Sequence, residues 1–131
     1  MIRNWVILAA SALAITACAP VSGGSEGHGK DVPMARATGA PRSCIPLNSI
    51  RESRVRDDWT IDFDTGGGKW YRVALPQRCY GLGTYRTYKY ETSLSELCST
   101  DIITVMEFGG PGSGPRGSCG LAQFQPVEIA K

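Results

Sequence analysis

Four cysteines have a spacing that constrains their chemistry. Cys44, Cys79, Cys98 and Cys119 lie 35, 19 and 21 residues apart. A structural zinc site needs pairs of cysteines only two to four residues apart, so this spacing does not predict one. An even number of well-separated cysteines instead predicts two disulfide bonds, which three different pairings satisfy.

Residues that could activate a nucleophile are scarce. The single histidine, His28, stands between two glycines, and no serine occupies a G-x-S-x-G turn. We therefore predict no catalytic triad, no metal site and no cofactor. Carboxylate pairs such as Glu91 with Glu96, or Asp101 with Glu107, leave a carboxylate-based hydrolase as a third hypothesis, although ordinary chains also contain such pairs.

Two motifs in the middle of the chain resemble ligand-binding loops only in part. The run Gly66 to Lys69 is followed by Trp70, where a phosphate-binding loop needs Ser or Thr, so we interpret it as a hairpin turn. Asp62 and Asp64 match half of a calcium loop, which also needs a ligand at its fifth position and a Glu at its twelfth. A solvated strand face is the ordinary interpretation of these carboxylates.

Aromatic and basic side chains alternate around two predicted strands. Such a set can stack on sugars and attract anionic groups, although tyrosine is also a common strand residue and Tyr88 could simply be part of the core. The predicted ligand-binding residues are Trp70, Arg72, Tyr85, Arg86, Tyr88 and Lys89.

The N-terminus has the three parts of a secretory signal. Residues 1–17 contain one positive charge at Arg3, an apolar run of about ten residues and a small residue before Cys18. The run is too short to span a bilayer, although an uncut anchor helix is the alternative. The segment from Ile15 to Cys18 resembles a bacterial lipobox, which implies a lipidated Cys18. Because Ala19 follows instead of Asp, the resemblance implies anchoring to the outer membrane, facing the periplasm.

Composition indicates a tether followed by a small folded domain. Residues 18–43 are rich in Gly, Pro and Ser and lack aromatic residues, so we predict a lipidated, flexible tether. Residues 44–131 should form a β domain stapled by disulfides, because a chain this small buries too little surface to be stable on its core alone. The 14 Lys and Arg against 12 Asp and Glu, with 42% hydrophobic residues, exclude a polybasic nucleic-acid binder.

Alternating polar and apolar residues predict about five to six short strands. Residues 59–64 and 69–75 alternate on either side of a glycine turn and predict a hairpin. Residues 93–98 fit a helical capping box, and residues 109–117 should be a mobile loop. The other predicted strands are a kinked one from about residue 47 to Asp57 and Asp58, then 84–91, 102–108 as the most buried, and 121–129 as an edge strand because of Pro126.

These elements predict a mainly β fold, a small antiparallel barrel or curved sheet with one short helix and two disulfides. If the strands form a simple meander, Cys44 and Cys98 lie at one end and Cys79 and Cys119 at the other. That topology favours the pairs Cys44–Cys98 and Cys79–Cys119 among the three pairings.

Several short motifs around the cysteines resemble a family of small bacterial envelope lipoproteins of unknown function. The resemblance implies the membrane anchor and the single stapled domain, but no activity. The matching residues are Cys44, Asp58-x-Thr60-Ile61-x-Phe63, Trp70-Tyr71, Leu75, Cys79-x-Gly81-Leu82, Leu97-Cys98-x-x-Asp101-x-Ile103, Cys119-Gly120-Leu121 and Phe124.

The first hypothesis is accordingly a non-enzymatic binding module anchored by lipid in the cell envelope. Its partners would be the membrane, through the anchor, and an envelope protein or glycan. The alternative is an inhibitor of a periplasmic hydrolase that inserts residues 109–117 into a cleft. An enzyme, as a carboxylate-based cell-wall hydrolase, is the third hypothesis.

Overall fold

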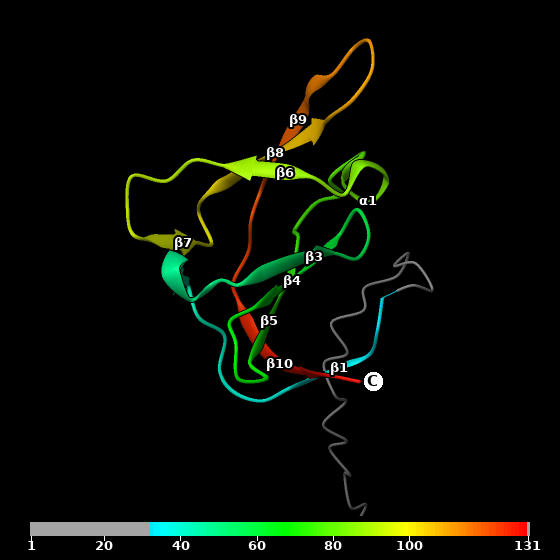
Figure 1. Ribbon diagram of the computed structural model, residues 1–131. Coiled ribbons are helices and arrows are strands. Elements are labelled where there is room, and N and C mark those ends of the chain that lie inside the picture. The colour runs from blue at the N-terminus through cyan, green and yellow to red at the C-terminus, as the bar shows by residue number, and fades with distance from the viewer. Residues whose placement is uncertain (1–31, 131) are drawn as a thin grey trace, which may run out of the picture.

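The computed structural model describes residues 32–130, and its largest sheet is built around the predicted hairpin (Figure 1). The strands β4 (Thr60–Asp64) and β5 (Trp70–Ala74) pair antiparallel through five residue pairs. Between them Gly66, Gly67 and Gly68 all have positive φ, which explains why three glycines stand at this turn. The hairpin prediction is therefore confirmed.

Three further strands complete this antiparallel sheet, in the order β1-β10-β5-β4-β3. They are β1 (Ala35–Ala37), β3 (Glu52–Val55) and β10 (Gln125–Ile129). Two smaller sheets accompany it: β2 (Cys44–Pro46) pairs with β7 (Glu96–Cys98), and β8 (Ile102–Glu107) lies between β6 (Tyr88–Tyr90) and β9 (Gly114–Gly120). The helical turns are η1 (Leu47–Ser49) and α1 (Leu82–Tyr85).

The mainly β fold with one short helix is confirmed, but the sheets do not close into a barrel. One hydrophobic core joins them. Phe63 of β4 and Phe124 pack edge to face with their ring centroids 5.6 Å apart, and both are fully buried. Ile45, Leu97 and Ile103 bring residues of the two smaller sheets into the same core.

Both disulfide pairings are confirmed. Cys44 and Cys98 are directly opposed in the β2–β7 ladder. Cys79, in the loop after β5, is bonded to Cys119 of β9 and so ties the five-stranded sheet to the β6-β8-β9 sheet. The topology is more complex than the meander from which the pairs were inferred.

The predicted position of the helix was wrong, and one predicted strand begins later than expected. Residues 96–98, at the end of the predicted capping box, form β7, because burying Leu97 beside Ile45 outweighs local helix preference. The helix lies instead at α1, which overlaps the first two residues of the predicted strand 84–91, and the later part of that strand forms β6. It is flanked by two left-handed residues, Gly81 with φ 86° and Arg86 with φ 54°.

Two predicted loop regions are partly strands. The last part of the expected tether contains β1, which pairs with β10, and Arg42 makes a bridge with Phe124. The expected mobile loop 109–117 already enters β9 at Gly114. The signal segment, Cys18 and His28 lie outside the described residues.

The predicted edge strand is an interior strand, and the most buried strand is not the predicted one. β10 lies between β1 and β5. Pro126 is tolerated because the residue opposite it on the β1 side is Thr38, which lies one position beyond the end of β1. The Thr38 amide donates a hydrogen bond to the Pro126 carbonyl at 2.9 Å.

The most buried strand is β4 and not β8. In β8 only Ile103 and Val105 are buried, whereas four consecutive residues of β4 are buried.

Candidate functional site

The face of β4 that we expected to be solvated is buried. Asp62 is fully buried, and its carboxylate accepts hydrogen bonds from Arg56 Nε at 2.8 Å and from Arg72 Nε and Nη2 at 2.8 and 2.9 Å. The two arginine side chains are only 17% and 10% exposed. Arg72 is therefore an internal partner of Asp62, and both carboxylate oxygens of Asp62 accept hydrogen bonds from arginine.

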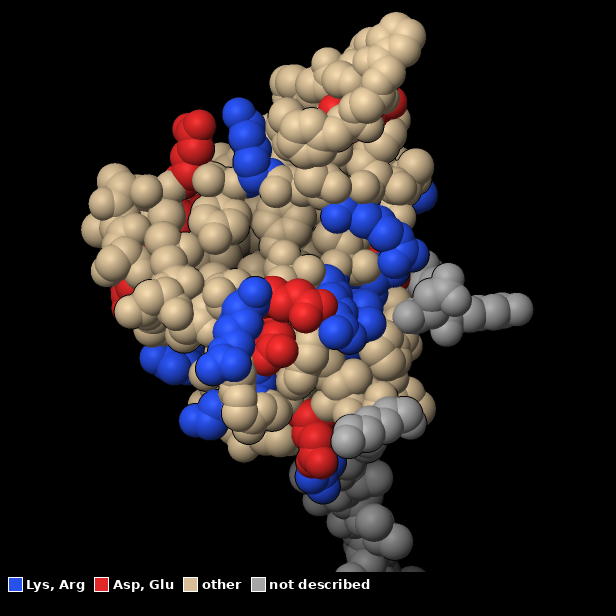
Figure 2. Space-filling model, in the orientation of Figure 1, with Lys and Arg blue, Asp and Glu red and all other residues tan. Residues whose placement is uncertain are grey.

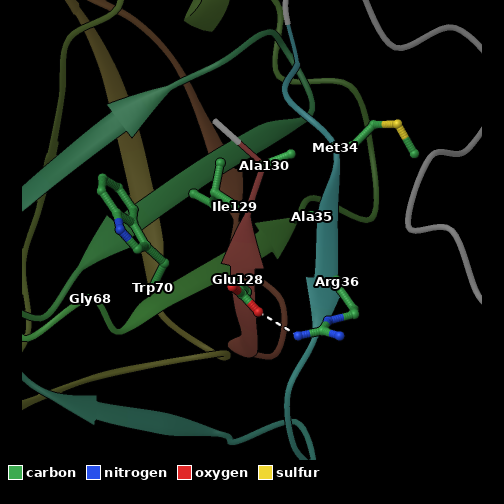
Figure 3. Close-up of a pocket in the computed structure, with 8 residues that line it drawn as sticks. All are labelled: Met34, Ala35, Arg36, Gly68, Trp70, Glu128, Ile129 and Ala130. Atoms are coloured by element: carbon green, nitrogen blue, oxygen red, sulfur yellow. Dashed lines mark hydrogen bonds and ion pairs between the residues drawn. The ribbon is translucent and has the colours of Figure 1, made fainter.

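Trp70 lies at the start of β5, beside a hollow of about 680 Å³ (Figure 3). The Arg54 guanidinium stacks 5.1 Å from the centre of its ring. The hollow forms where β5 and β1 begin and β10 ends, a junction that the sequence did not reveal because β1 lay within the expected tether. Its lining residues are Met34, Ala35, Arg36, Gly68, Trp70, Glu128, Ile129 and Ala130.

The other predicted ligand-binding residues lie on α1 and β6. Tyr88 packs against the core, and burial raises its pKa to about 12, so its hydroxyl stays neutral at physiological pH. Tyr85, Arg86 and Lys89 are exposed. The structure thus separates Trp70, on the five-stranded sheet, from these three, and the predicted set does not form one continuous face.

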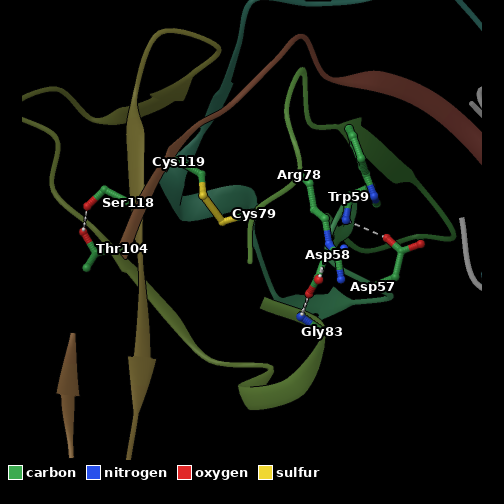
Figure 4. Close-up of a disulfide and its surroundings, with 9 residues drawn as sticks. All are labelled: Asp57, Asp58, Trp59, Arg78, Cys79, Gly83, Thr104, Ser118 and Cys119. Carbon is green, nitrogen blue, oxygen red and sulfur yellow. Dashed lines mark hydrogen bonds and ion pairs between the residues drawn. A yellow bond between two sulfur atoms is a disulfide. The ribbon is translucent and has the colours of Figure 1, made fainter. Parts of the chain in front are cut away.

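The segment between β5 and α1 positions an exposed tyrosine, Tyr80. Asp58 accepts hydrogen bonds from Arg78 Nε at 2.9 Å and from the Gly83 amide at 2.7 Å (Figure 4). The Arg78 guanidinium in turn lies 4.6 Å from the centre of the Tyr80 ring. Tyr80 is 72% exposed, so this segment holds a flat aromatic surface in solvent beside the Cys79 disulfide.

Replacing Gly83 with Ala should lower the free energy of unfolding by about 1–3 kcal/mol. A Cβ on Gly83 would lie 3.1 Å from the Asp58 amide nitrogen and 3.2 Å from the Asp57 carbonyl carbon, and these backbone atoms have little freedom to move. Urea unfolding measures the change. Gly120→Ala is the matched control, because its Cβ would meet nothing within 4 Å. Equal unfolding midpoints for the two variants would contradict the prediction.

The most prominent surface feature is the hairpin of β8, residues 108–113 and β9, which we call the arm (Figure 1). Phe108 at its turn is 70% exposed. The tip carries no charged side chain, whereas positive and negative groups intermingle over the body of the face in Figure 2.

Arg116 orients the turn of the arm. Its guanidinium forms an ion pair with Glu107, donates to the Gly112 carbonyl at 2.7 Å and lies 5.9 Å from the centre of the Tyr85 ring. The arm is therefore held beside α1, and Phe108 projects from a supported hairpin.

Metal ligation has little support in the described structure. Within residues 32–130, the cluster with donor atoms close enough to hold a metal is Cys44, Glu96 and Cys98, whose donors lie within 4.8 Å of one another. The two sulfur atoms are bonded to each other as a disulfide, so they are not thiolate ligands.

No helix within residues 32–130 is long and apolar enough to cross a membrane.

Comparison with known proteins found no relative of this chain. No family model, curated protein or solved structure matches it.

Proposed function

We propose that the protein is a non-enzymatic binding module of the bacterial cell envelope. Lipid on Cys18 would anchor it to the outer membrane facing the periplasm, and the arm would contact an envelope protein. The proposed location is supported by residues 1–17, which resemble a secretory signal, and by Ile15 to Cys18, which resemble a lipobox. The contact is supported by one observation above the others, the exposed Phe108 on a projecting hairpin.

An aromatic side chain at a projecting tip is suited to fill a pocket in a partner. Aromatic residues dominate the binding energy of protein interfaces because they bury a large apolar area with few rotatable bonds. The base of the arm is fixed in the core through Ile103 and Val105, and Arg116 fixes the turn. This preorganisation lowers the entropy lost on binding.

The placement of carboxylates supports a non-enzymatic role. Asp101 accepts a hydrogen bond from the Cys98 amide at 2.7 Å, and Glu107 is paired with Arg116. One of the carboxylate pairs considered for hydrolysis is thus engaged in structural contacts. A general acid and base would have to be free to contact a substrate.

Inhibition of a periplasmic hydrolase is a second candidate, favoured by the same uncharged tip. A narrow turn with one exposed aromatic side chain matches the shape of an active-site cleft better than a flat receptor surface. Loss of a captured hydrolase's activity on adding the purified protein would select this candidate, whereas unchanged activity would leave the arm as a docking element.

Replacing Phe108 with Ser should reduce capture of the partner from solubilised envelope by at least about tenfold without lowering the melting temperature. Phe108 is largely exposed, so its loss removes little from the core. Leu94→Ser is the matched control, because Leu94 is 62% exposed on the loop before β7. Equal capture by both variants would exclude the arm as the contact.

The proposed location and lipid anchor are tested separately, by measuring the intact mass of the protein extracted from membranes. The anchor would be supported by a mass equal to that of the chain from Cys18 with three acyl chains. Both disulfides would be supported by four thiols that react only after reduction. An uncut or unlipidated chain would contradict the anchor.

A further inference from the structure

We infer that the hollow between β1, β5 and β10 rests on the lipid surface to which the chain is anchored. The inference depends on the proposed anchor at Cys18 and extends it, because it assigns a membrane-facing side to the folded domain. The protein would then be oriented, with the hollow toward the bilayer and the arm away from it.

The chemistry of the hollow suits the interface of a bilayer. Met34, 83% exposed, is a large apolar side chain with no cover among the described residues, and it lines the hollow with Trp70 and Ile129. Tryptophan favours the level of the lipid headgroups, where its ring is in an apolar environment and its N–H remains near water. The charged lining residues Arg36 and Glu128 form an ion pair with each other (Figure 3), so the hollow is not strongly charged.

The position of the hollow in the chain identifies the membrane as its occupant. Only 13 residues lie between Cys18 and Val32, the first described residue, and Met34 follows two positions later. The flexible tether expected from the sequence would reach about 20 Å over this length. A tether of this length holds the hollow at a millimolar effective concentration of bilayer, so even a weak affinity keeps it docked.

The opposite end of the molecule is free for a partner. Figure 1 places β1 and the end of β10 at one end of the domain and the turn of the arm at the other. Docking of the hollow would thus present Phe108 to the periplasm. A freely rotating domain would bring the arm against its own membrane for part of the time.

The experiment replaces the acyl anchor by a chemical one, so that its outcome does not depend on lipidation in the cell. The chain from Cys18 to Lys131 keeps every described element. With the other four cysteines in disulfides, Cys18 is its free thiol. The Cys18 thiol is coupled to maleimide lipid in vesicles of phosphatidylethanolamine and phosphatidylglycerol. The protein also carries Trp59→Phe, so that Trp70 is its fluorescent tryptophan. Docking is measured as the quenching of Trp70 fluorescence by lipids that carry a spin label near the headgroup.

We expect quenching in the parent protein and in Phe108→Glu, the matched control at the far end. Met34→Glu should lower the docking equilibrium constant about tenfold, because it removes an apolar side chain from the contact. Absence of quenching in the parent would overturn the inference, as would equal quenching in all three proteins. Failure of the anchor itself would appear only in the intact mass.

Discussion

Replacing Asp62 with Asn is expected to lower the free energy of unfolding by about 3–5 kcal/mol. The carboxylate is fully buried and is the shared partner of Arg56 and Arg72. Asparagine keeps its shape but removes its negative charge, so two guanidinium groups that are largely withdrawn from water would lose their counter-ion. Urea unfolding of the oxidised protein measures the loss.

Two variants separate this effect from other causes. Glu128→Gln breaks an ion pair whose side chains are 79% and 65% exposed, and it should change stability by less than about 1 kcal/mol. Replacing all three charged residues, as Arg56→Met, Asp62→Leu and Arg72→Met, should recover most of the stability lost in Asp62→Asn. An Asp62→Asn protein as stable as Glu128→Gln would contradict the prediction.

Local pattern was sufficient where neighbouring residues decide the structure. The β4–β5 hairpin follows from alternation on both sides of three glycines that all adopt positive φ. The disulfide pairs also followed from rough topology, since it was enough to know which cysteines lie near the same end of the strands. The hairpin requires no knowledge of distant contacts, whereas the disulfide pairs were inferred from an assumed meander that is simpler than the observed topology.

Asp62 and Leu97 illustrate why other features could not be predicted. Alternation in β4 identifies two faces but does not reveal that the second is covered, because the cover comes from Arg56 and from Arg72 on the next strand. Leu97 sits in a sequence that favours a helix, yet its burial opposite Ile45 decides for a strand. In both cases a tertiary contact outweighs the local preference.

The candidate contact surface was only partly visible in the sequence. Glycine content pointed to residues 109–117 as the loop for insertion, but it did not reveal that Phe108 projects at the turn or that Arg116 supports it. Tyr80 acquires its exposed position from Arg78 and Asp58. Asp58 lies 20 positions before Arg78 in the sequence, and no short motif connects the two.

Removing both disulfides should leave the domain unfolded at physiological temperature. The bonds close loops with sequence separations of 54 and 40 residues, and the chain-entropy model assigns each about 4 kcal/mol. Their sum is comparable with the whole stability of a small domain, about 5–15 kcal/mol. Circular dichroism of the protein with all four cysteines replaced by Ala should therefore lack the native β signal, and a native spectrum would contradict the prediction.

The two single-disulfide variants should differ in function more than in stability. Cys44→Ala with Cys98→Ala removes a bond between β2 and β7, two strands that are already paired, and neither cysteine lies in the arm. Cys79→Ala with Cys119→Ala removes the bond that ties β9, and so the arm, to the loop carrying Tyr80. Both should lose about 4 kcal/mol in urea unfolding, but only the second should weaken capture of the partner under conditions where both remain folded. Equal capture would mean that the position of the arm does not depend on this bond, and that Arg116 alone is sufficient to orient Phe108.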